Sequence, residues 1–402
     1  MRNNLKLQKI LLTGGGTAGS VAPLLAIAEE LKNSPNPVRL SAHDEALYQG
    51  GNFEFLWIGT KYGPEREMVE KENIKFKSIV GGKLRRYFSW CNFIDPIFII
   101  VGCFQSFFII LNWRPNLVIT AGSFISVPVV WVAWLLRVPA LVHQQDVRPG
   151  LANKLMAPLA KVITVTFGQS LKDYGKKAVW TGNPIRREIR NLPPPWRGPV
   201  SAGKFSARGG SAFGGEIREL KKKWQLKDDL PVVLIIGGGT GAMAINQLVR
   251  QSLEELTKFC QVILISGKNK GGLTSNFEVK PPMNFQKFEF LNAEQMAQAL
   301  KLADLAITRA GMSFLTELSY LGKPTIIIPL PDSHQQDNAA MFKDAAVVLN
   351  QKGLTEEIFI NKVKNLLADK EQQQSLSKKI KTIIKTGAKE NIVEIIKNIL
   401  YL

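Results

Sequence analysis

Glu317 and Gln335 are two side chains whose types and spacing could bind a polar ligand. Glu317 lies in a predicted helix after a buried strand; Gly311 allows a sharp turn there, and Ser313 can cap the helix. Gln335 lies in a polar loop after a second buried strand, residues 325–328. Ligands of open parallel sheets bind at the carboxyl ends of strands, so both side chains should face one crevice. There the carboxylate of Glu317 could bind a ribose diol and the amide of Gln335 could bind the same ligand, which would suit a nucleotide sugar. The alternative is that this stretch is an ordinary βαβ unit whose helix start is solvated.

Two glycine-rich loops share one design, because each follows an apolar strand and precedes a helix: residues 13–20 and residues 237–242. In such a loop free N–H groups converge and small residues allow close approach, which suits a phosphate or another anion. The first loop also fits the dinucleotide fingerprint, although no clear acid follows the next strand; its glycines are Gly14, Gly16 and Gly19.

Predicted strands alternate with predicted helices along the whole chain, which indicates an α/β fold with parallel sheets. Together with the repeated glycine loop, this predicts two Rossmann-like doubly wound domains that face a cleft. The length of 402 residues also suits two domains. We expect one domain over residues 1–188 and another over residues 231–387. Between them, residues 189–230 form a linker or insertion, and its Pro/Gly/Ser-rich part predicts no packed structure.

The chain carries 52 Lys and Arg against 33 Asp and Glu, a formal net charge of +19. This balance favours anionic partners such as nucleic acid, phosphates or an anionic membrane face. The cysteines show no paired spacing and no ligand-like neighbours, which argues against disulfides and zinc and fits a reducing cytoplasm. The N-terminus shows no signal-peptide pattern.

A segment that mixes basic and aromatic residues precedes an almost entirely apolar run, residues 97–111. Asp95, Pro96 and Asn112 bound this run at roughly 15 residues, short of the about 20 that a membrane span needs. We therefore predict a buried or partly exposed helix that docks on an anionic bilayer surface. The alternative is a core helix beside a solvated loop. The residues predicted to dock are Lys83, Arg85, Arg86, Tyr87, Phe88 and Trp90.

Six motifs, in their order and spacing, make the chain similar to the MurG family of glycosyltransferases over nearly its whole length, apart from residues 41–52 and 192–215. They are Gly15-Gly16-Thr17-Ala18-Gly19-Ser20, Ala121-Gly122-Ser123-Phe124, His143-Gln144-Gln145-Asp146, Gly182-Asn183-Pro184-Ile185-Arg186, Gly238-Gly239-Thr240-Gly241-Ala242 and the region from Arg309 to Asn338.

This resemblance implies a two-domain GT-B transferase that moves N-acetylglucosamine, with inversion, from UDP-N-acetylglucosamine to undecaprenyl-pyrophosphoryl-muramoyl-pentapeptide. It implies no cofactor and no metal for chemistry, and the sequence has no Asp-x-Asp triplet. The implied partners are both substrates and an anionic membrane surface, with no nucleic acid. The implied location is peripheral, on the cytoplasmic face of the cell membrane. A C-terminal helix over about residues 388–402 is expected to pack on the first domain.

The resemblance also assigns roles in binding the donor. Glu317 would bind the ribose hydroxyls, Gln335 the sugar, and the main chain of Leu291 the uracil. A helix N-terminus and Arg186 would stabilise the charge that develops on departing UDP. The implied donor-binding residues are Thr17, Ala18, Gly19, Asp146, Arg186, Gly239, Thr240, Gly241, Leu291, Met312, Ser313, Phe314, Leu315, Thr316, Glu317 and Gln335.

The chain departs from the family pattern at the positions that would supply a catalytic base. The family's first loop usually ends in His, and here it ends in Ser20, which cannot accept a proton near neutral pH without help. The family's His-Glu-Gln-Asn reads His143-Gln144-Gln145-Asp146, so an acid and an amide have changed places. We expect Asp146 to be the base and His143 to be the next candidate. Alternatively, His143 is a strand-end residue satisfied by the backbone.

Three other functions remain open from the sequence. The chain could modify another membrane glycolipid, such as a diacylglycerol, or epimerise a sugar nucleotide. It could be a non-catalytic, membrane-docked protein that binds a UDP-sugar. The first glycine loop also leaves a dinucleotide-dependent oxidoreductase open, which the second loop and the missing acid disfavour.

Overall fold

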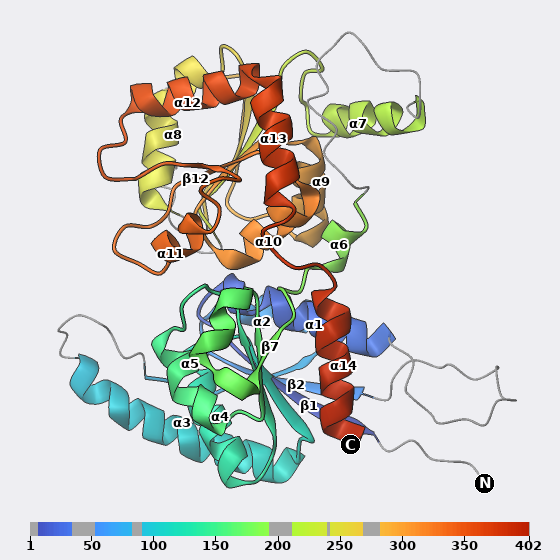
Figure 1. Ribbon diagram of the computed structural model, residues 1–402, viewed down its shortest axis with the longest axis vertical. Coiled ribbons are helices and arrows are strands. Elements are labelled where there is room, and N and C mark those ends of the chain that lie inside the picture. The colour runs from blue at the N-terminus through green and yellow to red at the C-terminus, as the bar shows by residue number, and fades with distance from the viewer. Residues whose placement is uncertain are drawn as a thin grey trace, which may run out of the picture. The chain divides into compact units, whose positions relative to one another are not determined.

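The computed structural model describes residues 7–33, 53–82, 91–192, 211–238, 242–267 and 282–401. The chain forms two compact units (Figure 1), one comprising Met1–Arg186 with Lys385–Leu402 and the other comprising Arg187–Ile384. Each unit is a parallel sheet with helices packed against it, so the prediction of two Rossmann-like doubly wound α/β domains is confirmed.

The first unit has a seven-stranded sheet in the order β3-β2-β1-β4-β5-β6-β7. The order reverses between β1 and β4, which lie side by side with Thr13 opposite Thr120. Loops after these two strands therefore meet at the switch point where open sheets bind ligands. The strands are β1 (Gln8–Thr13), β2 (Phe53–Gly59), β3 (Lys75–Ser78), β4 (Leu117–Thr120), β5 (Ala140–Gln144), β6 (Val162–Val165) and β7 (Ala178–Trp180).

Helices cover both faces of this sheet because successive strand residues point to opposite sides. Ile10 and Leu12 pack with α1 and α14, whereas Leu11 packs with α3, α4 and α5. On α14, Lys389 lies 3.3 Å from Glu29 and 3.4 Å from a carboxylate oxygen of Glu30, both on α1. The C-terminal helix thus belongs to the first unit. The helices are α1 (Ala22–Asn33), α2 (Glu65–Lys71), α3 (Cys91–Trp113), α4 (Ser126–Leu135), α5 (Leu151–Met156) and α14 (Ala388–Tyr401).

The second unit has a six-stranded sheet in the order β10-β9-β8-β11-β12-β13, with its switch point between β8 and β11. Its strands are β8 (Val232–Ile236), β9 (Gln261–Ile265), β10 (Phe285–Phe288), β11 (Leu305–Thr308), β12 (Thr325–Ile327) and β13 (Val347–Val348). Its helices are α6 (Arg187–Arg190), α7 (Ser211–Lys223), α8 (Met243–Leu256), α9 (Ala293–Leu302), α10 (Met312–Leu321), α11 (Gln335–Ala340), α12 (Glu356–Ala368) and α13 (Lys370–Ile380). Val249 on α8 and Phe359 on α12 pack with Ile235 and Ile307 in its core.

Two predicted boundaries differ from the structure. The expected start of the apolar helix at residue 97 is wrong, because α3 begins at Cys91 and contains Pro96. Pro96 is the sixth residue of the helix, so its missing N–H removes one helical hydrogen bond, and the helix continues past it. Helix α7 begins at Ser211, inside the tract for which no packed structure was expected; residues 193–210 lie outside the described residues.

His143, the fourth residue of β5, is fully buried and hydrogen-bonded through both ring nitrogens. Its Nδ1 lies 2.9 Å from Thr164 Oγ1 on β6, and its Nε2 lies 2.9 Å from Asn183 Oδ1 in the segment after β7. Burial lowers the pKa of His143 from 6.5 to about 4, and the hydrogen bond to the Asn183 side chain only partly opposes this. The imidazole is therefore a neutral cross-link between neighbouring strands.

We predict that His143 makes the first unit sensitive to acid. Because its pKa is depressed in the folded state, its contribution is present above pH 6.5 and is lost as the pH falls towards about 4. A pKa difference of this size corresponds to roughly 3 kcal/mol of unfolding free energy. Urea denaturation at about pH 7.5 and about pH 4.5 measures this loss. His143→Gln, which cannot titrate, should lose less between the two pH values than the wild type does.

His334→Gln provides the matched control, because His334 is exposed on the second unit. An equal acid-induced loss in the wild type and in His143→Gln would show that His143 does not cause the sensitivity.

Candidate active site

The second glycine loop follows β8 directly, at the switch point of the second sheet. Gly238 has φ of +95°, a backbone conformation that favours glycine. A Cβ atom on Gly237 would overlap the main chain of Ala242, so the loop closes only without a side chain there. The predicted donor residues Gly239, Thr240 and Gly241 lie outside the described residues.

Helix α10 begins beside this loop, after β11. Its N-cap is Gly311 in extended backbone with no side-chain cap, so the expected cap by Ser313 is wrong; Ser313 is the second residue of the helix. A Cβ on Gly311 would meet nothing within 4 Å. Gly311 therefore places no side chain of its own at the positive end of the helix, which suits a phosphate. The predicted residues that share this start are Met312, Ser313, Phe314, Leu315 and Thr316.

Two side chains, Arg309 and Asn338, connect the loops after β11 and β12. Both residues belong to a motif of the sequence, but no role was predicted for either. Arg309 donates from Nη1 to Ile328 O at 3.0 Å and to Pro329 O at 3.2 Å. Asn338, fully buried on α11, donates from Nδ2 to Ala310 O at 3.0 Å. Burial lowers the pKa of the Arg309 guanidinium below its usual range. These bonds fix α11 beside the start of α10.

Glu317 and Gln335 lie on the two helices that these bonds join. Glu317 is buried on α10, with only 4% of its surface exposed. Gln335 is the first residue of α11, and its Oε1 accepts a hydrogen bond from Leu330 N at 3.1 Å. This bond orients the amide and leaves its Nε2 as the group that can donate to a ligand. The predicted pair therefore lies at the end of the sheet where the sequence placed it.

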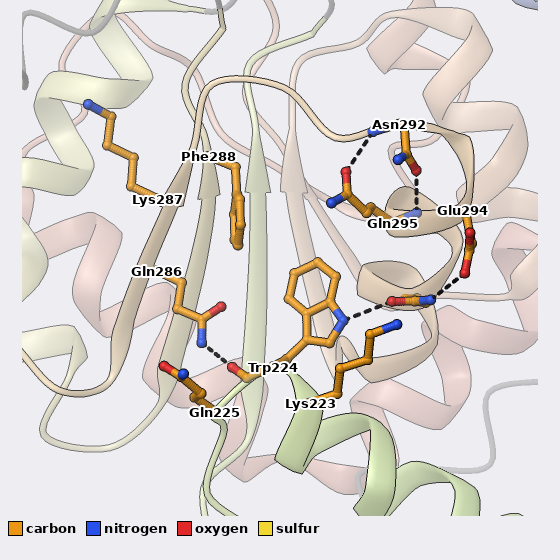
Figure 2. A pocket seen from close by; sticks show the side chains of 10 residues that line it. Lys223, Trp224, Gln225, Gln286, Lys287, Phe288, Asn292, Glu294 and Gln295 are labelled. Atoms are coloured by element: carbon orange, nitrogen blue, oxygen red, sulfur yellow. Dashed lines mark hydrogen bonds between the residues drawn. The ribbon is translucent and has the colours of Figure 1, made fainter. Parts of the chain in front are cut away.

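The main chain around Leu291 is fixed by the start of α9. Asn292 and Gln295 form a reciprocal capping box, with Gln295 N donating to Asn292 Oδ1 at 2.9 Å and Asn292 N donating to Gln295 Oε1 at 3.0 Å. A cavity of about 590 Å³ lies beside this cap, and Figure 2 shows the side chains that line it. In it the ring of Trp224 stands against that of Phe288, with centroids 5.4 Å apart. Neither Glu317 nor Gln335 lines this cavity, so it is separate from the switch point.

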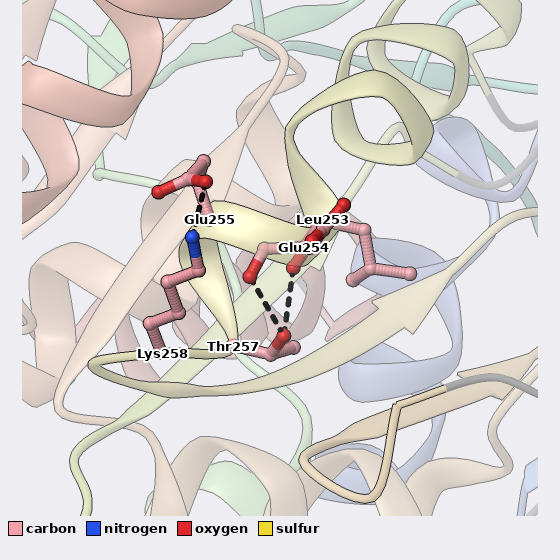
Figure 3. A network of polar contacts seen from close by, with 5 residues as sticks. All are labelled: Leu253, Glu254, Glu255, Thr257 and Lys258. Atoms are coloured by element: carbon pink, nitrogen blue, oxygen red, sulfur yellow. Dashed lines mark hydrogen bonds and ion pairs between the residues drawn. The ribbon is translucent and has the colours of Figure 1, made fainter.

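Helix α8, which follows the second glycine loop, is closed at its far end by a local polar network (Figure 3). Thr257 Oγ1 donates to Leu253 O at 2.9 Å and to Glu254 O at 3.1 Å. Lys258 forms an exposed ion pair with Glu255. The network satisfies main-chain carbonyls at a helix C-terminus and has a structural role.

In the first unit, three successive residues of the glycine loop are each held by a different side chain. Trp57 Nε1 donates to Gly14 O at 3.0 Å, and Ser123 Oγ donates to Gly15 O at 2.9 Å. Gly16, with φ of +79°, donates its N–H to Glu65 Oε2 at 3.1 Å. The contacts of Trp57 and Glu65 with this loop were not predicted from the sequence. The loop that was expected to bind an anion thus already holds one, the carboxylate of Glu65.

The predicted residues Thr17, Ala18 and Gly19 continue this loop. Thr17 is exposed, and Ala18–Ser20 forms a short 3₁₀ turn. Ser20 is buried, with its Oγ 3.5 Å from Thr17 O. The hydroxyl therefore points back into its own turn.

Asp146 lies in the loop after β5 and is half-buried. The loop is held by Gln144, whose Nε2 donates to Asp146 O at 2.7 Å and to Arg148 O at 3.0 Å. Gln144 Oε1 accepts from Tyr174 OH at 2.9 Å. Since His143 is enclosed in the core and Ser20 in its turn, Asp146 is the most accessible of the three candidate bases.

Fewer contacts are defined for Arg186 and for the predicted docking residues. Arg186 is half-buried and is the last residue of the first unit. The docking residues Lys83, Arg85, Arg86, Tyr87, Phe88 and Trp90 lie outside the described residues. Among the residues that the structure describes, no group of three His, Cys, Asp or Glu side chains could hold a metal ion.

Comparison with known proteins gives one consistent family. Residues 10–165 match the glycosyltransferase family 28 N-terminal domain, and residues 232–395 match its C-terminal domain. A Clostridium kluyveri protein is 36% identical over 90% of this chain and 91% of its own length. A Clostridium botulinum protein is 35% identical over 97% of this chain and 99% of its own length. Both are named UDP-N-acetylglucosamine--N-acetylmuramyl-(pentapeptide) pyrophosphoryl-undecaprenol N-acetylglucosamine transferase.

Solved structures share the fold at lower identity. Acinetobacter baumannii MurG superposes with a TM-score of 0.64 and 21% identity, covering 97% of this chain and 99% of that one. A Neisseria meningitidis UDP-GlcNAc 2-epimerase bound to UDP-GlcNAc superposes with a TM-score of 0.65 and 13% identity, covering 97% of this chain and 100% of that one. On the sequence identity and on both domain matches, the chain belongs to glycosyltransferase family 28, within the MurG family.

Proposed function

We propose that this protein transfers N-acetylglucosamine, with inversion, from UDP-N-acetylglucosamine to the lipid-linked acceptor undecaprenyl-pyrophosphoryl-MurNAc-pentapeptide. The observation that carries the proposal is the identity of 35–36% along nearly the whole chain with transferases whose names state both substrates. The arrangement of polar groups at the two switch points supports it.

The second unit would hold the donor. Glu317 would accept hydrogen bonds from the ribose diol, the Nε2 of Gln335 would donate to the sugar, and the main chain at Leu291 would face the uracil. The N–H groups at the start of α10 would meet the diphosphate, whose negative charge grows as UDP departs. Arg186 would add a cation there. We propose that the chemistry needs no metal, because these groups supply the required charge stabilisation.

The first unit would supply the acceptor side, with Asp146 as the base that removes the proton of the attacking hydroxyl. A carboxylate in a half-buried loop, fixed at its main chain by Gln144, has both the access and the support that a general base needs. His143 would serve this site only as the neutral cross-link beneath it.

We further propose that α3 docks the enzyme on the anionic surface of the cytoplasmic membrane leaflet. Residues Asp95–Trp113 are long and apolar enough to cross a bilayer by length and composition, and 17% of an 18-residue window among them is buried. The exposed apolar side chains continue onto the neighbouring helix α4, which an apolar core would not require. We call them the apolar face: Ile97, Phe98, Ile100, Val101, Phe104, Phe108, Leu111, Trp131, Trp134 and Leu135.

Incubation with UDP-N-acetylglucosamine and the lipid-linked acceptor should release UDP and form a disaccharide lipid. Glu317→Gln should weaken UDP binding about 10- to 100-fold in calorimetry, because a hydrogen bond to a charged group is worth about 1.5–3 kcal/mol. Glu357→Gln, exposed on α12, is the matched control and should bind UDP normally. If UDP is released only with another lipid, that lipid is the acceptor. If the donor binds without turnover, the protein is non-catalytic.

Asp146→Asn should cut turnover at least about 100-fold, since the amide cannot take up the proton. Asp173→Asn, exposed in the same unit, controls for loss of a charge. Turnover retained in Asp146→Asn would remove Asp146 from the role of base.

Phe104→Glu should reduce binding to anionic vesicles by about tenfold or more in a sedimentation assay, because burying a Phe is worth about 1.5–3 kcal/mol. Phe104 is 64% exposed on α3, and Met283, 86% exposed on the second unit, gives the matched control Met283→Glu. Equal vesicle binding by the two variants would exclude α3 as the docking surface.

A further inference from the structure

We propose that Glu65 is a positioning residue of the transfer reaction, which acts by holding the first glycine loop in its working conformation. The inference rests on the proposed function and adds to it a residue that touches neither reacting group. Its basis is a set of contacts between α2 and the loop at the switch point of the first sheet.

Both oxygens of the Glu65 carboxylate are used, and the side chain is fully buried. Oε2 accepts the N–H of Gly16 at 3.1 Å. Oε1 accepts the N–H of Thr60 at 2.7 Å and the hydroxyl of Thr60. The carboxylate therefore links the end of β2 to the loop after β1, two neighbouring strands of the sheet.

The surrounding backbone leaves room for this carboxylate and for little else. A Cβ atom on Gly15 would overlap Glu65 Oε1, and one on Gly63 would overlap Glu65 Oε2. A Cβ on Gly59 would lie 3.1 Å from Glu65 Cγ and closer still to the ring of Phe76. Three glycines thus surround one acid, so the chain here is shaped around the side chain at this position.

The chemistry of the contacts requires an acid and not its amide. Two main-chain N–H groups face the two carboxylate oxygens, one on each. Glutamine would present oxygen to one N–H group and its own NH₂ to the other, which would leave a buried donor without an acceptor. A buried carboxylate is costly unless it is fully hydrogen-bonded, and here the local structure provides those bonds.

This placement has a consequence for the bound reactants. The N–H of Gly16, which a phosphate on a glycine loop would otherwise use, is already taken by Glu65. The loop therefore presents residues 17–20 in a fixed conformation instead of closing around an outside anion. A loop that is preorganised in this way can align a reactant without rearranging during the reaction.

Glu65→Gln tests the proposal, with Glu67→Gln as the matched control because Glu67 is an exposed acid of the same helix. The first readout, hydrogen exchange of the peptide that contains Gly16, does not depend on activity. We expect exchange to be about tenfold faster or more in Glu65→Gln and unchanged in Glu67→Gln.

The second readout is turnover with UDP-N-acetylglucosamine and the lipid-linked acceptor, measured well below the unfolding temperature of each variant. We expect kcat to fall about tenfold or more in Glu65→Gln, since small displacements of positioning groups cost this much. The Kd for UDP should change less than kcat does, because the proposed contacts of Glu317, Gln335 and the start of α10 lie in the second unit. If Glu65 had only a role in stability, Glu65→Gln would lower the unfolding temperature and leave kcat unchanged.

If Glu65→Gln does not fold, Thr60→Val replaces it, since this change removes one of the three hydrogen bonds and should shift both readouts in the same direction by less. Unchanged exchange at Gly16 would overturn the proposal, and so would faster exchange with unchanged kcat. An inactive wild type would refute the proposed function and with it any role in transfer, while exchange would still show whether Glu65 holds the loop.

Discussion

Main-chain N–H groups at the carboxyl ends of parallel strands need hydrogen-bond acceptors, and the two units of this protein supply them differently. In the first unit, the acceptor for Gly16 is the chain's own Glu65. In the second unit, α10 begins at Gly311 with no side-chain cap and with open space where a side chain would stand. The first glycine loop is closed on an internal anion, whereas the N-terminus of α10 has no side-chain cap. This difference supports the proposal that the diphosphate binds in the second unit, although the sequence shows a glycine-rich loop in both units.

The features that the sequence predicts well are those that depend on neighbouring residues. Apolar runs and glycine turns place most strands within a residue or two, and the βα junction at Gly311 stands where the pattern puts it. Contacts between distant residues escape such reasoning. Glu65 looks like an ordinary acid in a first helical turn, and its partner Gly16 is 49 positions away. One of the two interpretations of His143 gave it backbone partners, yet its partners are side chains 21 and 40 positions away.

The burial of helix α3 also depends on contacts with residues distant in sequence, which its own sequence does not predict. Its sequence is apolar on all sides, which usually indicates burial, and the pattern cannot tell which side a neighbour covers. In the structure α4 packs along one side, where Ile110 is buried, while Phe104 and Phe108 on the same helix remain exposed. Exposure, more than composition, therefore supports a membrane as the partner of this face.

The exchange of acid and amide between positions 144 and 146 becomes physically coherent once the loop is seen. Gln144 is buried and uses its NH₂ group to bind the carbonyl oxygens of Asp146 and Arg148. A carboxylate at position 144 could not donate these bonds and would place negative charge against two carbonyls. An amide at position 144 therefore suits this loop better than an acid does. The negative charge stands instead at Asp146, which is more accessible to a substrate hydroxyl. The two substitutions thus support each other: one fixes the loop and the other gives it the group that can accept a proton.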